Sequence, residues 1–303
     1  MATLGIIDFG SNSLKVSVFD GQQKEIARTS ESVRIFKAEG ERVVIAPDVM
    51  QAAVEAIQRL KNFAQQKGAT QIYILGTSAV RDCENRQQLL ETLTQQTGLK
   101  MMVISGEVEA RLVAQAVKKD PAYAHYQNIL AFDLGGGSLE VVRVQYQQCT
   151  LAKSFPLGVV RLMHDFMAHP HLALGSEGER KIKNHLYAAL KPVLSADLAD
   201  NHLIVGAGGA FSIIALYLEA MGESPVGGRL PLLRIRELKD KMLNLPLAER
   251  SQIAGIPKDR ADIMPISLVV LDVLAELTGA EAFYLTHRGV RHGMVDLIQQ
   301  GIL

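Results

Sequence analysis

Two acidic residues enclose a run of glycines in the middle of the chain, and this stretch carries the residue types best suited to phosphate chemistry. Asp133 and Glu140 flank a segment that contains Gly135 to Gly137 and Ser138. Glycines without Cβ atoms let backbone N–H groups converge on an anion. Carboxylate oxygens beside phosphate are the ligands that Mg²⁺ prefers. The segment is therefore predicted to bind phosphate and a divalent cation.

The same pattern occurs a second time near the N-terminus. Asp8 lies 125 positions before Asp133 (133 − 8), and Gly10, Ser13 and Leu14 precede Gly135, Ser138 and Leu139 by the same interval. One position changes sign, because Lys15 stands where Glu140 does. A unit repeated at this distance predicts two related domains that face each other with a ligand between them. The alternative is two unrelated β-hairpins with Gly-Ser turns.

The elements around each loop are those that would hold it at a strand end. Apolar residues 129–132 and 141–144 predict the two strands of a hairpin, and residues 4–8 and 14–19 repeat this arrangement. A third strand is expected over Glu25 to Phe36. A helix from Pro47 to Gln66, a strand at 71–75, a helix at 85–97 and a strand at 100–104 complete an α/β arrangement.

Two further groups in the first half are candidates for the site. Arg81 follows the strand at 71–75, where an arginine either holds phosphate or is a surface or capping residue. Ser105 is expected to cap a helix that carries Glu107 and Glu109. Glu107 can pair with Arg111 four residues later, whereas Glu109 has no local partner of this kind. Glu109 is therefore the better candidate for an acid that faces a ligand.

The second half contains another glycine turn and a basic segment. The strand 202–205 leads into Gly206, Gly208 and Gly209 and then into a helix, a geometry that favours anion binding. Asp262 is expected to cap a helix that ends at Gly279, with Arg260 just before it. The segment 227–255 is expected to be helical, and its basic residues form either a solvated face or a binding surface for a polyanion. These residues are Arg229, Arg234, Arg236, Lys239 and Lys241.

Composition narrows the class of protein. Basic and acidic residues number 32 each in the 303-residue chain, so no global field indicates nucleic acid or an acidic membrane as a partner. Cys83 and Cys149 lack CxxC spacing, and no apolar run reaches the roughly 20 residues of a membrane span. We expect a soluble, cytoplasmic protein with domains at residues 1–120 and 121–303, divided near Lys118-Lys119-Asp120-Pro121.

Several stretches together resemble the ordered motifs of the exopolyphosphatase and guanosine pentaphosphate phosphatase (Ppx/GppA) family in its short, two-domain form. The resemblance spans nearly the whole chain and implies two duplicated ribonuclease-H-like domains of the actin, Hsp70 and sugar-kinase superfamily, with an active-site cleft between them. The stretches that carry it are 8–13, 77–81, 105–112, 133–140 and 260–265.

The resemblance also implies roles for individual residues. Glu109 would be the general base, Mg²⁺ would be the cofactor, and Asp8, Asp133 and Glu140 would lie at the metal. Leu139, Ala210, Val108 and Lys15 depart from the family's usual residues, which leaves turnover and substrate preference open. The phosphate-binding residues would be Gly10, Ser11, Asn12, Ser13, Lys15, Arg81, Gly135, Gly136, Gly137, Ser138, Gly206, Gly208, Gly209 and Arg260.

The activity implied is Mg²⁺-dependent release of orthophosphate from the end of inorganic polyphosphate by in-line attack of water. The alternatives are a phosphohydrolase that removes the 5′ γ-phosphate of guanosine pentaphosphate (pppGpp), and a non-catalytic sensor of polyphosphate or nucleotide. A sugar kinase of the same superfamily is less favoured, because the chain is short and Glu109 stands where a hydrolytic base is needed. The resemblance alone suggests a homodimer, and domain closure on ligand is expected from the two-domain plan.

Overall fold

The computed structural model describes residues 2–35, 37–39 and 42–300, and the chain divides into two compact units. Unit 1 comprises Met1–Ala116 and Val290–Leu303, and unit 2 comprises Val117–Gly289. The first boundary lies close to the predicted one at 120/121. The C-terminal end differs from the prediction, because the last helix returns to unit 1. Phe36, the end of the predicted third strand, lies outside the described residues.

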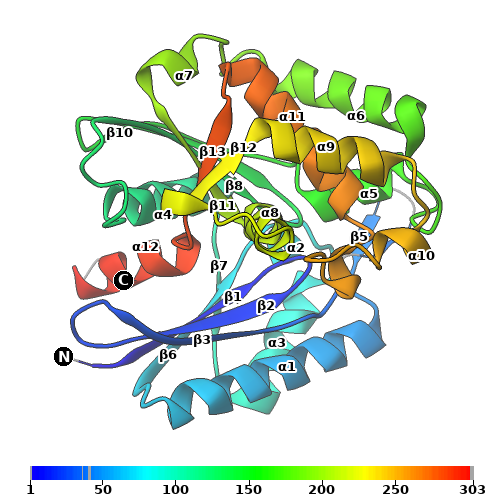
Figure 1. Cartoon of the computed structure of the whole chain (residues 1–303). Coiled ribbons are helices and arrows are strands. Elements are labelled where there is room, and N and C mark those ends of the chain that lie inside the picture. Colours follow the sequence, from blue (N-terminus) through cyan, green and yellow to red (C-terminus); the bar gives the residue numbers. More distant parts are fainter. Residues whose placement is uncertain (1, 36, 40–41, 301–303) are drawn as a thin grey trace. The chain divides into compact units, whose positions relative to one another are not determined.

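Unit 1 is a mixed sheet with helices on both faces (Figure 1). The strand order is β3-β2-β1-β6-β7, with β1 antiparallel to β2 and parallel to β6. Helices α1 and α3 lie on one side of the sheet and α12 on the other. The elements are β1 (Leu4–Phe9), β2 (Leu14–Phe19), β3 (Glu25–Glu31), β4 (Lys37–Glu39), β5 (Arg42–Val44), α1 (Pro47–Gln66), β6 (Gln71–Gly76), α2 (Ser78–Arg81), α3 (Arg86–Thr97), β7 (Met101–Val103), α4 (Gly106–Lys118) and α12 (Val290–Gln299).

Local signals explain why these helices form where they do. Pro47 opens α1, where its missing N–H costs nothing, and the helix buries apolar residues at helical spacing, including Val54, Ile57 and Leu60. Gly98 ends α3 in the left-handed region with φ of 71°. The predicted helices at 47–66 and 85–97 are therefore confirmed to within a residue.

Unit 2 repeats the opening order of the first sheet. Its strands run β10-β9-β8-β11-β13-β12, so the meander of β8, β9 and β10 corresponds to β1, β2 and β3. The elements are β8 (Asn128–Leu134), β9 (Leu139–Gln145), β10 (Gln148–Phe155), α5 (Val159–Phe166), α6 (Gly175–Leu190), α7 (Leu198–Asn201), β11 (Leu203–Gly208), α8 (Gly209–Ala220), η1 (Val226–Gly228), β12 (Arg229–Pro231), α9 (Leu232–Leu243), α10 (Leu247–Arg250), η2 (Lys258–Arg260), α11 (Met264–Thr278) and β13 (Ala282–Leu285).

The shared order of β3-β2-β1-β6-β7 and β10-β9-β8-β11-β13 confirms the expected duplicated α/β organisation. In both units a parallel strand, β6 or β11, lies beside the first strand of the meander. The carboxyl end of that first strand leads directly into the glycine loop. The duplication therefore places both loops at equivalent positions of their own sheets.

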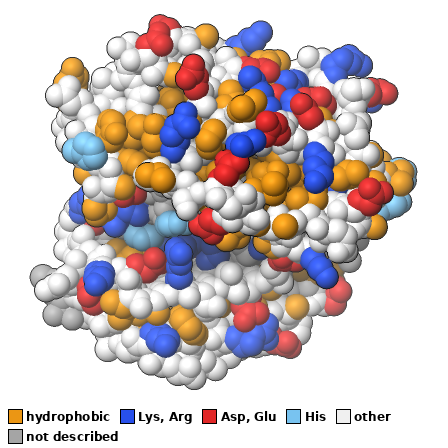
Figure 2. Space-filling view, in the orientation of Figure 1, with side chains coloured by type: hydrophobic (Ala, Val, Ile, Leu, Met, Phe, Trp, Pro, Cys, Tyr) orange, Lys and Arg blue, Asp and Glu red, His pale blue; other side chains and the backbone are white. Residues whose placement is uncertain are grey.

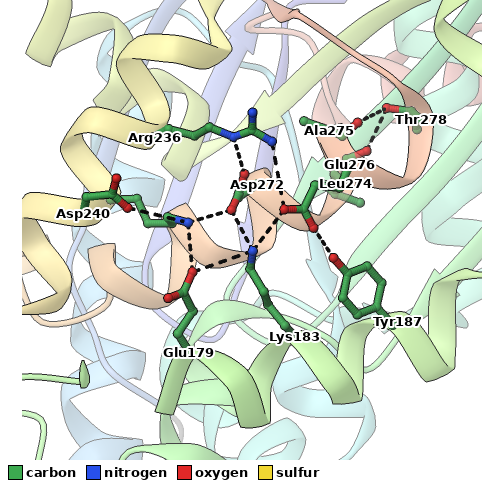
Figure 3. A network of polar contacts seen from close by, with 11 residues as sticks. Glu179, Lys183, Tyr187, Arg236, Asp240, Asp272, Leu274, Ala275, Glu276 and Thr278 are labelled. Carbon is green, nitrogen blue, oxygen red and sulfur yellow. Dashed lines mark hydrogen bonds and ion pairs between the residues drawn. The ribbon is translucent and has the colours of Figure 1, made fainter. Parts of the chain in front are cut away.

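A buried polar network joins α6, α9 and α11 within unit 2 (Figure 3). Asp272 is 1% exposed and accepts hydrogen bonds from Lys183, Arg236 and Lys239. Burial alone raises the pKa of Asp272, but these three donors outweigh it and hold the pKa at about 2. The carboxylate is therefore ionised near neutral pH and fastens three helices together.

Two local predictions in unit 2 differ from the structure. Helix α11 begins after Ile263 without a side-chain cap, so the prediction that Asp262 caps it is wrong, although Gly279 does end it with φ of 73°. The segment 227–255 is only partly helical, because Pro231 precedes α9 and Pro246 precedes α10. Within the described part of the chain, no helix has the length and apolar character needed to cross a bilayer.

Candidate functional site

Both glycine loops connect strands that pair in the same register. In unit 1 Asp8 lies opposite Lys15, and in unit 2 Asp133 lies opposite Glu140. Directly opposed residues project from the same face of an antiparallel pair and lie close together. The predicted repeat is therefore present in the backbone. The residue opposite the aspartate differs in charge between the two loops, because it is a lysine in unit 1 and a glutamate in unit 2.

The loop of unit 2, residues 135–138, is braced by the start of α5. The N–H groups of Val159 and Val160 donate to the carbonyls of Gly135 and Gly136, at 3.0 and 2.8 Å. Arg161 donates through Nε to the carbonyl of Gly137 at 3.1 Å. These donors engage three successive loop carbonyls on the α5 side. Because the carbonyls are engaged, the loop can offer its backbone amide N–H groups to an anion.

Close packing explains the glycine that precedes α5. A Cβ atom on Gly158 would lie 2.3 Å from the backbone of Gly137 and 2.4 Å from that of Gly136. Contacts this short do not occur in real structures. Gly158 therefore lets α5 approach the loop closely enough to hold it, a role that motif spacing did not reveal.

A second glycine turn borders Asp133. Strand β11 pairs with β8, so that Ala207 lies opposite Asp133, and Gly208 follows with φ of 97°. A Cβ atom on Gly208 would lie 3.0 Å from Asp133 Oδ1, and one on Gly289 would lie 3.1 Å from Oδ2. The structure thus brings the turn at Gly206, Gly208 and Gly209 next to the loop of unit 2, with Gly208 beside one carboxylate oxygen of Asp133 and Gly289 beside the other.

Glu140 is the other carboxylate of this loop. It is 2% exposed, and Ser154 on β10 donates a hydrogen bond from Oγ to its Oε1 at 2.7 Å. Leu139 beside it is fully buried. The side chain of Leu139 therefore serves core packing, which is how this departure from the family's usual residue is accommodated.

The loop of unit 1, residues 10–13, is held by neighbouring strand ends. Ser11 and Ser13 are buried, and the hydroxyls of Ser11 and Ser78 lie 3.4 Å apart. The N–H of Ile35 donates to the carbonyl of Ser11 at 3.2 Å. Thr77 donates from Oγ1 to the carbonyl of Phe9 at 3.1 Å. The segment 77–81 therefore adjoins this loop, as expected for residues that follow a parallel strand.

Helix α4 buries one of its two first-turn acids and exposes the other. Glu109 is 5% exposed, whereas Glu107 is exposed and pairs with Arg111 at 2.6 Å, as predicted. Ser105 accepts the N–H of Val108 through Oγ at 3.2 Å, which confirms its expected capping role. Glu109 is therefore the buried acid of this pair, and its predicted role as the acid that faces a ligand stays a prediction.

Glu109 has a partner that lies far from it in the sequence. Arg81 at the end of α2 donates from Nη1 to Glu109 Oε2 at 3.0 Å and to the carbonyl of Ile104 at the same distance. This ion pair links the end of α2 to the first turn of α4. Arg81 was predicted to contact phosphate, and that role stays a prediction beside the ion pair observed here.

Three predicted basic residues of unit 2 are neutralised by acids. Arg236 and Lys239 bind Asp272 in the network of Figure 3, and Arg234 pairs with Glu223 and Glu237. Figure 2 shows acidic and basic side chains interspersed over the region of α6 and α9. These contacts favour the solvated, paired face over a binding surface for a polyanion.

Arg260, predicted to contact phosphate, has its Nε 3.4 Å from Asp259 Oδ2.

Arg291 is a residue beside the candidate site that sequence reasoning missed. It lies on α12 and donates from Nε to Ser17 Oγ at 2.8 Å, while its Nη1 lies 3.5 Å from Asp8 Oδ2. Asp8 and Arg291 are separated by 283 positions. Residue spacing along the chain could not predict a contact between residues this far apart. The predicted domain division also placed residue 291 in the second domain.

The carboxylates of Asp133 and Glu140 in unit 2 fit a magnesium ion whose coordination shell is completed by substrate. Among the residues that the structure describes, no group of three or more His, Cys, Asp and Glu side chains could hold a metal by itself. Mg²⁺ is usually held by one or two carboxylates together with water and substrate phosphates. Asp133 and Glu140, with both Asp133 oxygens bordered by glycines, supply such a donor set.

Comparisons with known proteins agree with this architecture. Exopolyphosphatase 1 of Mycobacterium tuberculosis is 25% identical over 309 residues, which cover 96% of this chain and 87% of the relative. An exopolyphosphatase structure from Cytophaga hutchinsonii matches with a TM-score of 0.87 at 20% identity over 99% of this chain and 98% of that one.

An Aquifex aeolicus member of the Ppx/GppA family matches with a TM-score of 0.76 at 21% identity, again over 99% of this chain and 98% of that chain. A sequence profile of the Ppx/GppA phosphatase family matches residues 16–300. This match runs from within β2 to the end of α12, so it includes the whole second hairpin, Glu109 and the glycine turn at 206–209, whereas the loop at residues 10–13 precedes it. The chain belongs to the Ppx/GppA phosphatase family.

Proposed function

We propose that this protein is an exopolyphosphatase, which hydrolyses the terminal phosphoanhydride bond of inorganic polyphosphate and releases orthophosphate. The observation that carries the proposal is the burial of Glu109 beside Arg81, at the start of the helix that follows β7. A buried carboxylate held in a fixed position is suited to take a proton from water. Relatives named exopolyphosphatase support the choice of substrate.

In the proposed reaction, the oxygen of a water molecule attacks the terminal phosphorus while Glu109 accepts a proton from that water. The bond between phosphorus and the bridging oxygen breaks, and the electron pair leaves with the shortened chain. The loop N–H groups at 10–13 and 135–138 and at the turn 206–209 would bind the phosphate oxygens. Lys15 and Arg260 would add positive charge at the phosphates.

The cofactor of this reaction is proposed to be Mg²⁺, held by Asp133 and Glu140. When bound, the ion would neutralise charge on the phosphate oxygens. Ser154 would orient Glu140 through its hydrogen bond, and Arg161 and the N-terminus of α5 would hold the glycine carbonyls in place. Most of the rate acceleration is then expected from positioning and charge, as in phosphoryl transfer generally.

The test compares Glu109→Gln with Glu107→Gln, its matched control on the same helix. Phosphate release from long-chain polyphosphate with Mg²⁺ is measured for both variants and the wild type, after circular dichroism shows that all three are folded. We expect Glu109→Gln to lose about 10²- to 10⁴-fold in kcat, the usual cost of removing a general base. Glu107→Gln should retain activity, because Glu107 is exposed and pairs only along the helix with Arg111 among its described contacts.

Equal activity of all three proteins would remove Glu109 from the role of base. If the folded wild type releases no phosphate from polyphosphate, the same assay with pppGpp tests the alternative substrate. Tight binding of either ligand without release would indicate a sensor. Phosphate release from polyphosphate that depends on Glu109 contradicts the sensor.

A further inference from the structure

Asp120 is a buried acid of unit 2 that the proposed reaction does not use. It accepts a hydrogen bond from Thr286 Oγ1, although the two residues are 166 positions apart, and their exposed fractions are only 7% and 3%. Its Oδ1 also accepts the N–H of Ala122 at 2.9 Å, in the turn that follows α4. Thr286 directly follows β13. A buried polar pair of this kind fixes two distant segments to each other.

Tyr123, in the same turn as Asp120, reinforces this connection. Its buried hydroxyl donates to the carbonyl oxygen of Leu285 at 2.7 Å. Burial raises the pKa of Tyr123 to about 12, so the hydroxyl stays protonated near neutral pH and remains a donor. A Cβ atom on Gly228 would lie 2.7 Å from this hydroxyl oxygen, so η1 also packs closely against it. The turn at 120–123 therefore holds the end of β13 at two successive residues.

Thr286 connects this turn to both sides of Asp133. Its N–H donates to the carbonyl oxygen of Gly206 at 2.9 Å, in the glycine turn that borders Asp133 Oδ1. Its Oγ1 accepts the N–H of Arg288 at 3.0 Å, and the next residue, Gly289, borders Asp133 Oδ2. The two backbone segments beside the carboxylate of Asp133 therefore both bond to Thr286.

The position of these two segments matters for a carboxylate that binds a metal. A Cβ atom on Gly208 would lie 3.0 Å from Asp133 Oδ1, and one on Gly289 would lie 3.1 Å from Oδ2, so backbone lies close to both oxygens. A carboxylate confined in this way loses less freedom when it binds a cation. Groups that hold a metal ligand in place typically change metal affinity by about 10- to 100-fold.

We propose that Asp120 and Thr286 are positioning residues for the cation site at Asp133. Asp120 orients the hydroxyl of Thr286. Thr286 in turn holds the glycine turn 206–209 and the segment 286–289 where they confine the carboxylate of Asp133. Both residues act through the backbone, so their removal should lower metal affinity while the ligands stay the same. The proposal rests on the proposed function only in taking Asp133 as a ligand of the divalent cation.

Mn²⁺ binding to the whole protein, measured by electron paramagnetic resonance without turnover, tests this assignment. Thr286→Val replaces the hydroxyl by a methyl group of similar size, Thr286→Ser retains the hydroxyl, and Asp120→Ala removes its acceptor. Thr278→Val is the matched control, because Thr278 is also buried in unit 2 and, among its described contacts, donates only to carbonyls of its own helix, α11. Asp133→Asn tests the cation site itself.

We expect Thr286→Val and Asp120→Ala each to weaken Mn²⁺ binding about tenfold, the lower end of the effect of groups that support metal ligands. Thr286→Ser should bind Mn²⁺ like the wild type. The double variant should bind no more weakly than Thr286→Val alone, because both single variants break the same hydrogen bond. A merely structural role would lower the melting temperatures of Thr286→Val and Thr278→Val alike and leave the Mn²⁺ affinity of both folded proteins unchanged.

Wild-type Mn²⁺ affinity in folded Thr286→Val would overturn the proposal, and so would an equal loss of affinity in Thr278→Val. If Thr286→Val does not fold, Asp120→Ala decides by the same comparison. Wild-type affinity in Asp133→Asn, or a wild type that binds no Mn²⁺, would remove Asp133 from the proposed cation site and overturn this inference with it. A wild type that binds Mn²⁺ as expected but releases no phosphate contradicts the hydrolase alone.

Discussion

The loop at residues 10–13 and the loop at residues 135–138 are alike in backbone and unlike in charge. A Cβ atom on Gly10 would lie 3.1 Å from the carbonyl oxygen of Ser13, and one on Gly135 would lie 3.3 Å from that of Ser138. In both turns the glycine lies close to the carbonyl oxygen of the residue three positions later. The two turns therefore have the same backbone construction. Duplication preserved the place of each aspartate but changed the residue opposite it, which is Lys15 in the first hairpin and Glu140 in the second.

The two loops also differ in what supports them. The second loop is fastened by N–H groups of α5 to three successive glycine carbonyls, whereas the first is held by the Ser11–Ser78 contact and by the N–H of Ile35. A helix N-terminus that engages the carbonyl side leaves the opposite side to amide donors. We infer that the second loop is the more rigid, and that its glycine positions tolerate substitution least.

The largest effect is expected when the second loop is given the charge of the first. Glu140→Lys places a cation opposite Asp133, as Lys15 lies opposite Asp8, and should weaken Mn²⁺ binding at least about 100-fold because a metal carboxylate is replaced by a positive charge. Mn²⁺ titration by electron paramagnetic resonance measures the change. Glu219→Lys, at an exposed acid of the same unit, is the control. Equal Mn²⁺ affinity of the two variants would contradict the charge argument.

A smaller effect is expected from loosening the brace. Gly158→Ala introduces a Cβ atom that would lie 2.3 Å from Gly137, and overpacking of this kind typically costs about 1–3 kcal/mol in the free energy of unfolding. Gly209→Ala is the control, because a Cβ atom there meets nothing within 4 Å. Urea unfolding followed by circular dichroism compares them. Equal stability of both variants would show that α5 and the loop can separate at little cost.

Elements and loops could be predicted from sequence because local chemistry determines them. Pro47 and Gly98 bound helices in the way that their backbone preferences require, and the paired aspartate loops are defined by spacing along the chain. Asp262 was wrongly predicted to cap α11, since the helix starts two residues later and without a side-chain cap. Capping residues compete locally, and only the folded backbone decides among them.

The contacts that distinguish the two loops could not be predicted, because they join residues distant in sequence. Arg291 reaches Asp8 only because α12 returns to unit 1, and Arg81 reaches Glu109 only through the order of strands β6 and β7. The acidic partners of Arg236 and Lys239 come from α11 and α6, so these two basic residues of α9 are paired in the folded protein. Charge patterns along one helix do not reveal such partners.

The smallest effect is expected from two serines that support side chains at opposite loops. Ser154→Ala removes the hydrogen bond to Glu140 and should weaken Mn²⁺ binding about fivefold, the equivalent of roughly 1 kcal/mol for one hydrogen bond. Ser17→Ala removes the acceptor of Arg291 in unit 1 and should leave Mn²⁺ affinity at the wild-type value, because the proposed metal carboxylates belong to unit 2. Electron paramagnetic resonance on both variants measures the two affinities. If both substitutions weakened Mn²⁺ binding equally, the first hairpin would also contribute to the cation site, because each support would then act on one shared function.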